Sequence, residues 1–269
     1  MGPDGDVMFE LRTVQSNAWR SLWEVLKEIL TDITLQIDED GIRLNAIDGS
    51  HVSLVNMKLE AINFEYFHCP ATMSIGLNCA NVFKLLKSVS NVDCVKWYIM
   101  SGSSNLLHVV IENADKNYRT DYALKLLDLD EDNMKIPEFE NNITIVNMPS
   151  VELQRIVRDM YALSTNIYIR MTTRDQLELS CEGDIASQKT ILGQYDSGLS
   201  ITMGTESAVS ENEYIFEGKY SLKYLLLFVK STNLTSNCEL LLRKGFPLII
   251  RYAVASLGTI NFCLAPRDV

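Results

Sequence analysis

The feature that most restricts the fold of this chain is a series of short segments in which apolar and polar residues alternate. A period of two is typical of half-buried β-strands. Turn-forming pairs such as Asp40-Gly41 and Asp48-Gly49 separate several of the segments. Because parallel strands need long crossovers, such close spacing predicts antiparallel sheets. The predicted strands include residues 33–37, 42–47, 52–57, 143–148, 167–171 and 177–180.

Four longer segments instead have helical spacing, with apolar residues three or four positions apart. Ser16, Asn78 and Ser221 are predicted to start three of them, and Pro149-Ser150 the fourth. Two segments fall in each half of the chain, at similar distances from its start. The sequence therefore predicts an α+β fold of two similar domains, each with antiparallel sheets and two helices. The predicted helices are residues 16–30, 78–90, 149–163 and 220–231.

A polar, acidic stretch over residues 115–142 lies between the two halves and predicts an exposed connector. A second polar stretch, residues 194–213, predicts a surface loop with a strand inside it. The predicted organisation is a disordered extension over 1–7, a first domain over 8–124, a connector over 125–141 and a second domain over 142–269.

Cysteine use and charge exclude several classes of protein. The six cysteines are scattered without a C-x-x-C pair, and there are only three histidines, so no metal site and no cofactor are predicted. Such cysteines indicate core residues of a soluble intracellular protein. No run approaches the roughly 18 apolar residues of a membrane helix. The net charge of −11 argues against generic nucleic-acid binding.

The distribution of the basic residues points the other way. Every predicted helix carries two of them, three or seven positions apart and therefore on one face. For a single helix, an ordinary solvated face explains such a pair. The repetition of such a pair in all four helices favours one shared surface that contacts phosphates. No aromatic residues interleave with the basic ones and no recognition-helix motif occurs, which predicts contacts to the DNA backbone that are independent of base sequence. The residues are Arg20, Lys27, Lys84, Lys87, Arg155, Arg158, Lys223 and Lys230.

Five motifs then occur in a fixed order from residue 8 to the C-terminus. They are MFE (8–10), DGSHVSLV (48–55), DYALKLLDLD (121–130), IPE (136–138) and LAPR (264–267). In content, order and spacing they resemble proliferating cell nuclear antigen, the eukaryotic sliding clamp of DNA replication. Only the first seven residues lie outside the resemblance.

The resemblance implies a homotrimeric ring with pseudo-sixfold symmetry, in which the four helices of each chain line the hole. The eight basic residues fall where the family's DNA-facing basic residues lie. The ring would encircle double-stranded DNA and act as a polymerase processivity factor in the nucleus. Its partners would be DNA polymerase, the clamp loader and other replication and DNA repair proteins that carry a PIP-box peptide.

The connector and the C-terminus resemble the family's docking site for these peptides, an apolar pocket beneath the linker. For Val52 and Leu54, core packing is an equally good explanation, because both lie in a predicted strand. Asp48, Ser50 and His51 also invite a hydrolase interpretation, but neighbours on a strand point to alternating faces, so no catalytic residue is predicted. The pocket residues carried over by position are Ile47, His51, Val52, Leu54, Met134, Ile136, Pro137, Pro247, Ala265 and Pro266.

Ring closure in the family joins the exposed edge strands of neighbouring subunits. Here residues 106–112 are apolar and β-prone, and an exposed edge of this kind would aggregate unless paired. We expect it to pair with residues 189–193 of the next subunit, head to tail. The alternative is an internal sheet edge covered by a loop. The predicted interface residues are Leu107, Val109, Ile111, Lys189 and Ile191.

Three positions depart from the family pattern. Cys263 replaces an aromatic residue beside the terminal LAP, which would reshape the peptide pocket. Arg174 stands where eukaryotic members usually carry a ubiquitin-accepting lysine, and Ser21 stands where the family often has a second basic residue on the first helix. These changes suggest a divergent or viral member. A subunit of a heterotrimeric checkpoint-type clamp, or a protein scaffold without DNA function, are the alternative interpretations.

Overall fold

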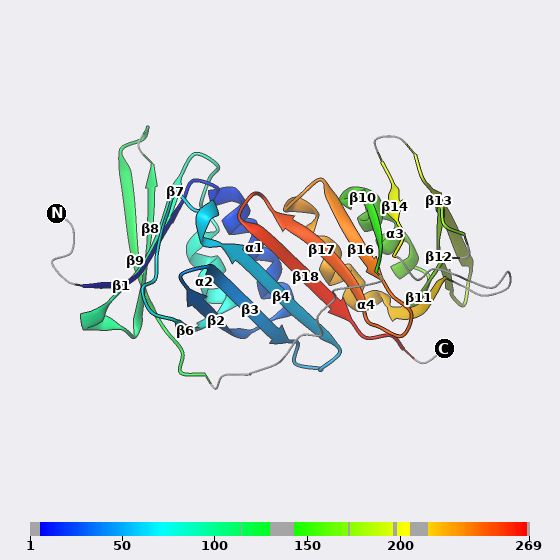
Figure 1. Ribbon diagram of the computed structural model, residues 1–269, viewed down its shortest axis with the longest axis horizontal. Helices are drawn as coiled ribbons and strands as arrows, with labels where there is room; N and C mark the ends of the chain where they lie inside the picture. The colour runs from blue at the N-terminus through cyan, green and yellow to red at the C-terminus, as the bar shows by residue number, and fades with distance from the viewer. Residues whose placement is uncertain are drawn as a thin grey trace. The chain divides into compact units, whose positions relative to one another are not determined.

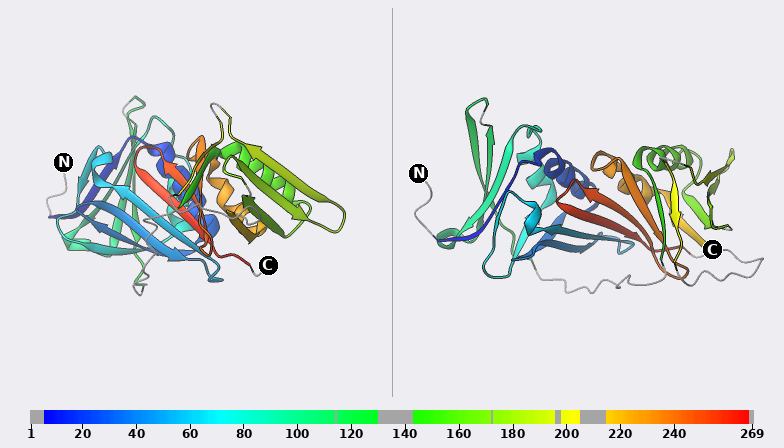
Figure 2. Two further views of the ribbon diagram at one scale, coloured as in Figure 1. Left: turned by 45° about the vertical axis from the view of Figure 1, so that its right-hand side comes forward. Right: turned by 45° about the horizontal axis from the view of Figure 1, so that its top comes forward.

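The computed structural model describes residues 6–113, 115–129, 143–171, 173–195, 198–204 and 215–267 (Figures 1 and 2). The chain divides into two units, each considered by itself. The first comprises the described residues of 1–49, 55–134 and 253–260, and the second those of 50–54, 135–252 and 261–269. Strands β4 (Ser53–Glu60), β17 (Leu248–Val254) and β18 (Gly258–Leu264) each contribute residues to both units.

One sheet of the first unit has the strand order β5-β1-β7-β8-β9, with antiparallel pairing between neighbours. Trp97 of β7 lies on its buried side. In the register of the outer pair, Val109 lies opposite Tyr122 and Ile111 opposite Thr120. The strands are β1 (Val7–Thr13), β5 (Tyr66–His68), β7 (Cys94–Met100), β8 (Leu106–Asn113) and β9 (Tyr118–Lys125).

The two helices of this unit, α1 (Ser16–Ile29) and α2 (Cys79–Leu86), lie side by side against one face of the strands β2 (Asp32–Asp38), β3 (Gly41–Ile47) and β6 (Met73–Asn78) (Figure 1). Strand β2 pairs antiparallel with both β3 and β6. The apolar sides of the helices are buried, and Trp19 and Trp23 of α1 pack edge-on and tilted against Trp97. Short 3-10 helices lie at Ala61–Asn63 and Ser101–Ser103.

The second unit repeats this arrangement. Strand β10 pairs antiparallel with β14 and β16, β16 pairs with β17, and a further sheet has the order β13-β12-β11-β15. The strands are β10 (Thr144–Pro149), β11 (Asn166–Met171), β12 (Gln176–Glu182), β13 (Ser187–Gly193), β14 (Ser200–Thr202), β15 (Phe216–Ser221), β16 (Asn237–Leu242) and β17 (Leu248–Val254).

Helices α3 (Ser150–Tyr161) and α4 (Leu222–Phe228) of this unit pack against each other, and a 3-10 helix, η3 (Val229–Asn233), continues α4. Their buried sides carry Leu153, Ile156 and Val157 from α3 and Leu225 and Phe228 from α4. The predicted fold, antiparallel sheets with two helices in each half, is therefore confirmed.

Helix boundaries differ from the prediction in physically explicable ways. Asn78 caps α2 as predicted, its side chain accepting a 3.0 Å hydrogen bond from the Asn81 backbone N–H. The prediction for Ser16 is wrong, because Gln15 holds the cap position and the Ser16 hydroxyl donates to the Ser90 carbonyl at 2.8 Å. The fourth predicted helix is shorter, because its first two residues end strand β15.

The predicted edge strand is also wrong. Strand β8 lies between β7 and β9, and Leu107, Val109 and Ile111 are at most 4% exposed. The outer strand is β9, which occupies part of the stretch predicted as a connector. Its residues largely alternate between half-buried and exposed, as expected for an edge, whereas Leu107, Val109, Val110 and Ile111 of β8 are all buried, as expected inside a sheet.

Three further predictions can be placed against the described residues. Strand β1 begins at Val7, within the predicted extension. Strand β14 lies inside the predicted loop over 194–213. Strand β4 begins at Ser53, so Asp48, Ser50 and His51 lie on a loop rather than on a strand.

Candidate functional site

The basic residues of the first unit lie opposite the buried sides of their helices, and they differ in how they are held. Arg20 pairs with Glu24 at 3.3 Å and donates to the Asn17 side chain at 3.1 Å. Lys27 pairs with Glu28 and lies 4.8 Å from the centre of the Phe83 ring. Both side chains are therefore half-buried and partly neutralised by their own helix.

On α2 the two lysines are exposed. Lys84 donates a 3.3 Å hydrogen bond to the Asn81 side chain, and Lys87 occupies the C-terminal cap position. Among residues 79–87 there is no acidic side chain. Its two lysines are therefore less neutralised by neighbouring acids than Arg20 and Lys27 of α1.

In the second unit all four predicted basic residues are exposed. Arg155 pairs with Asp159 at 3.4 Å, while Lys223 lies 5.9 Å from the centre of the Tyr224 ring. Lys230 lies on η3 rather than on α4. Long exposed cationic side chains on helices can contact phosphates without reading bases.

A loop between β3 and β4 carries several predicted pocket residues. His51, at its centre, has a backbone φ of 57°, in the left-handed region. For a non-glycine residue this costs on the order of 1–3 kcal/mol and persists only when neighbours hold it. The Ser50 and Tyr224 hydroxyls share a hydrogen bond, and the Ala265 N–H donates to the Val52 carbonyl at 3.3 Å. Two contacts thus bracket His51.

Beside this loop lies a small apolar cluster. Leu241, Ile249 and Cys263 are buried, and the partly buried Leu54 and Ile143 pack against them. Burial raises the pKa of the Cys263 thiol to about 12. Cys263 is therefore a neutral core residue.

The other predicted pocket residues divide into three groups. Ile47 and Pro247 are half-buried, and Ala265 and Pro266 are exposed. Met134, Ile136 and Pro137 lie outside the described residues. The Ser50 hydroxyl is hydrogen-bonded to Tyr224 of α4. The adjacency of Ser50 and His51 in sequence does not by itself make a nucleophile–base pair.

Arg267, which sequence reasoning did not assign to the site, ties down the C-terminal segment. Its N–H donates to the Lys219 carbonyl at 2.8 Å, and its guanidinium donates to the Asn166 side chain at 3.1 Å. With the bond from Ala265, the tail is held on both sides of Pro266. The only signal for this role was the position of Arg267 directly after the LAP motif.

Of the predicted interface residues, only those on β13 are accessible. Strand β13 is an outer strand of its sheet (Figure 1), Ile191 is 55% exposed, and Lys189 pairs with Glu178 at 2.6 Å. The predicted partner residues Leu107, Val109 and Ile111 are core residues, as noted above. The outer strand beside β8 is β9, and β5 is the outer strand at the other end of the same sheet.

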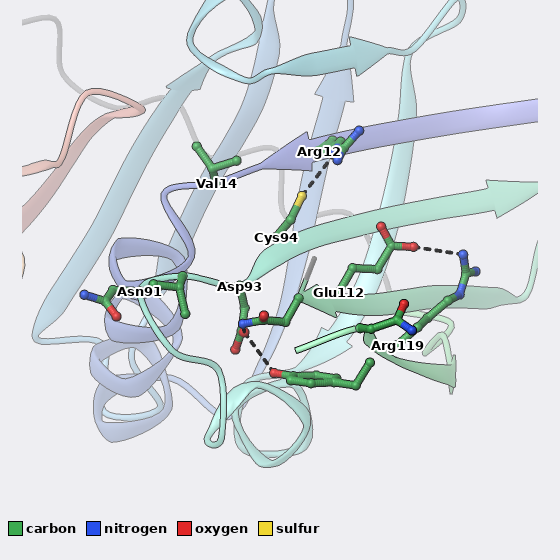
Figure 3. Close-up of a pocket in the computed structure, with 11 residues that line it drawn as sticks. Arg12, Val14, Asn91, Asp93, Cys94, Glu112 and Arg119 are labelled. Atoms are coloured by element: carbon green, nitrogen blue, oxygen red, sulfur yellow. Dashed lines mark hydrogen bonds and ion pairs between the residues drawn. The ribbon is translucent and has the colours of Figure 1, made fainter. Parts of the chain in front are cut away.

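A cavity of about 740 Å³ lies at the start of β9 (Figure 3). Arg12 and Cys94 lie side by side in its lining, where Arg12 Nε donates a 3.1 Å hydrogen bond to Cys94 Sγ. Arg119 donates to Glu112 at 2.8 Å. Asp93, another lining residue, accepts hydrogen bonds from Ser90, Asn113 and Tyr118. Arg12, Asp93, Glu112 and Arg119 are therefore all engaged with neighbouring side chains or backbone.

All six cysteines are free. Within the described parts of the chain, no group of three or more histidine, cysteine, aspartate or glutamate residues is placed to hold a metal ion. No helix in those parts has the length and apolar character needed to cross a membrane.

Comparison with known proteins identifies the family. Residues 8–135 match the N-terminal domain of proliferating cell nuclear antigen, and residues 135–267 match its C-terminal domain. A protein named "Probable DNA polymerase sliding clamp 1" from Paramecium bursaria Chlorella virus 1 is 36% identical over 267 residues, covering 98% of each chain. Proliferating cell nuclear antigen of Chaetomium thermophilum is 30% identical over 260 residues, covering 97% of this chain and 98% of its own. The chain belongs to the proliferating cell nuclear antigen family.

Proposed function

We propose that this protein is a DNA sliding clamp that acts as a polymerase processivity factor. The observation that carries the proposal is the match of both family domains across residues 8–267, together with basic side chains on all four helices. The relatives carry the names "Probable DNA polymerase sliding clamp 1" and "Proliferating cell nuclear antigen".

Its mechanism is topological. A closed ring around the duplex cannot leave sideways, so weak contacts between lysine or arginine and phosphate suffice, and they leave sliding fast. Lys84, Lys87, Arg155, Arg158, Lys223 and Lys230 supply these contacts, with Arg20 and Lys27 in a weaker role because of their acidic neighbours. The net charge of −11 disfavours DNA elsewhere on the surface.

The ring is a homotrimer closed through strand edges. In place of the predicted 106–112 segment, β9 of one copy pairs with β13 of the next, since both are outer strands whose free backbone groups need partners. The exposed Lys189 and Ile191 lie on the β13 side of this contact.

The peptide pocket recruits DNA polymerase, the clamp loader and other PIP-box proteins. His51, Val52 and Leu54 on one side and Ala265 and Pro266 on the other form its described walls. An aromatic anchor of the peptide would bury apolar area there, as is typical of interface hot spots.

The proposed clamp has no catalytic activity of its own and acts in the nucleus.

The test is retention on circular DNA. The protein is loaded by a clamp loader and ATP onto a nicked plasmid, passed over a sizing column in high salt, and compared with the same sample after linearisation. Retention on the circle and loss from the linear molecule support a topological clamp. Equal release from both would contradict it and favour a scaffold without DNA function.

The alternative within the fold is one subunit of a heterotrimeric checkpoint-type clamp. It requires a chain that does not close a ring with copies of itself. Purified protein that assembles alone would therefore disfavour it.

A further inference from the structure

We propose that Tyr224, on the helix that carries DNA-facing Lys223, is a positioning residue for the peptide pocket and holds the loop around His51 in its binding conformation. The inference rests on the proposed function of that pocket. It adds a residue that lies outside the pocket walls and acts through Ser50.

The first argument is the backbone of the loop. His51 has a φ of 57°, a conformation that a residue with a Cβ adopts only under restraint. On its C-terminal side, the Val52 carbonyl accepts a hydrogen bond from Ala265 at 3.3 Å. On its N-terminal side, the Ser50 and Tyr224 hydroxyls share a hydrogen bond, which is one restraint on the loop.

The second argument is the rigidity of the anchor. Tyr224 is only 9% exposed and belongs to the buried side of α4, where Leu225 and Phe228 fix the helix in the core. Ser50, in contrast, is exposed on its loop. A hydrogen bond between a buried, packed tyrosine and an exposed loop residue restrains the loop far more than it restrains the helix.

The third argument is the position of the loop relative to the tail. The tail segment that carries Ala265 and Pro266 is itself fixed through Arg267 to the Lys219 carbonyl and the Asn166 side chain. Both described walls of the pocket are therefore tied to elements of the second unit. Loss of the Tyr224 contact releases only the loop, because the contacts of Arg267 remain.

Tyr224→Phe is the appropriate variant. It removes the hydroxyl and keeps the ring, and with it the packing of α4 and the position of Lys223 5.9 Å from the ring centre. Tyr252→Phe is the matched control, since Tyr252 is a fully buried tyrosine of the same unit that lies on β17. Ser50→Ala removes the other partner, and Ser50→Thr retains a hydroxyl.

The experiment measures binding of a fluorescein-labelled synthetic PIP-box peptide to the full-length protein by anisotropy. We expect Tyr224→Phe and Ser50→Ala each to weaken binding about two- to tenfold, the range for loss of one hydrogen bond. The double variant should be no weaker than either single variant, because both remove the same contact. Ser50→Thr and Tyr252→Phe should bind as the unaltered protein does.

Amide hydrogen exchange supplies a readout that a general loss of stability would not reproduce. Exchange in residues 48–54 should become faster in Tyr224→Phe and unchanged in Tyr252→Phe. If the unaltered protein binds the peptide but Tyr224→Phe matches the Tyr252→Phe control in affinity and exchange, the positioning role is wrong and the pocket stands. If the unaltered protein binds no PIP-box peptide, the proposed pocket itself fails, and the positioning role fails with it.

Discussion

The hydroxyl of Tyr118, the first residue of β9, donates a 2.8 Å hydrogen bond to Oδ1 of the buried Asp93. The same oxygen accepts from the Asn113 side chain at 2.6 Å, and Oδ2 accepts from the Ser90 backbone N–H at 2.8 Å. Burial opposes ionisation of Asp93, but these hydrogen bonds outweigh it and hold its pKa below the ordinary value. The carboxylate thereby fastens the start of the proposed ring edge to the loop before β7.

Asp93→Asn should therefore destabilise the first unit by about 2 kcal/mol at neutral pH, because an amide cannot accept all three hydrogen bonds. The lowered pKa means that the stabilisation is present above the ordinary aspartate pKa and is lost as pH falls through the folded-state value. Urea unfolding followed by tryptophan fluorescence measures this, since Trp19, Trp23 and Trp97 all lie in the first unit. The difference between variant and parent should shrink in acid; a constant difference would contradict the account.

Ile191 and Ile111 should respond differently to substitution. Ile191 is 55% exposed on the outer strand β13, so Ile191→Asp should break the ring into monomers and leave the free energy of unfolding within about 0.5 kcal/mol. Ile111→Ala, in the core, should instead lower the free energy of unfolding by about 2–5 kcal/mol. Ile62→Asp, at a 90% exposed position of the first unit, is the control and should leave both properties unchanged. A trimeric Ile191→Asp protein would exclude β13 from the interface.

Reversing the charge of Lys84 and Lys87 should weaken DNA contact. Binding to a short duplex, measured between about 50 and 200 mM salt, should lose about one unit of log–log slope for each phosphate contact removed. The control variant combines Lys58→Glu with Lys244→Glu. It changes the net charge by the same amount as the α2 variant, but at a strand position and a turn position. If this control variant lowered the slope as much as the α2 variant, net charge rather than the helix face would be responsible.

The thiols should differ in reactivity in the folded protein. Burial raises the pKa of Cys79, Cys238 and Cys263 to about 12, so they remain protonated at about pH 8.5. Cys94 is partly exposed. Iodoacetamide followed by mass spectrometry should therefore label Cys94 first and the other three only on unfolding. Early labelling of Cys263 would show that the cluster beside the pocket opens readily.

The sequence predicted where helices and strands occur better than it predicted which parts of the chain lie beside them. Helical periodicity located all four helices, because each has a continuous apolar side such as Leu22, Val25 and Leu26 in α1. Asn78 was recognisable as a cap by residue type. Ser16 was not distinguishable from a cap, because its hydroxyl is taken by Ser90, far away in sequence.

The order in which the strands pair and the conformation of the loop around His51 could not be predicted from the sequence. The apolar run around Val109 favours a strand in either an edge or an interior position, and only the placement of β9 beside it decides between them. Likewise, the hydrogen bonds on either side of the left-handed His51 come from Tyr224 and Ala265, both distant in the chain. The family resemblance predicted which residues form the pocket, and the structure adds the hydrogen bonds that Ser50, Val52, Ala265 and Arg267 make.

The most direct test of the central claim is the solution mass of the purified protein, measured by light scattering on a sizing column over a range of concentrations. The homotrimeric ring predicts a species at three times the chain mass of 30.4 kDa, about 91 kDa. A species at 30.4 kDa that persists at the highest concentration would contradict it and direct attention to partner chains of a heteromeric clamp.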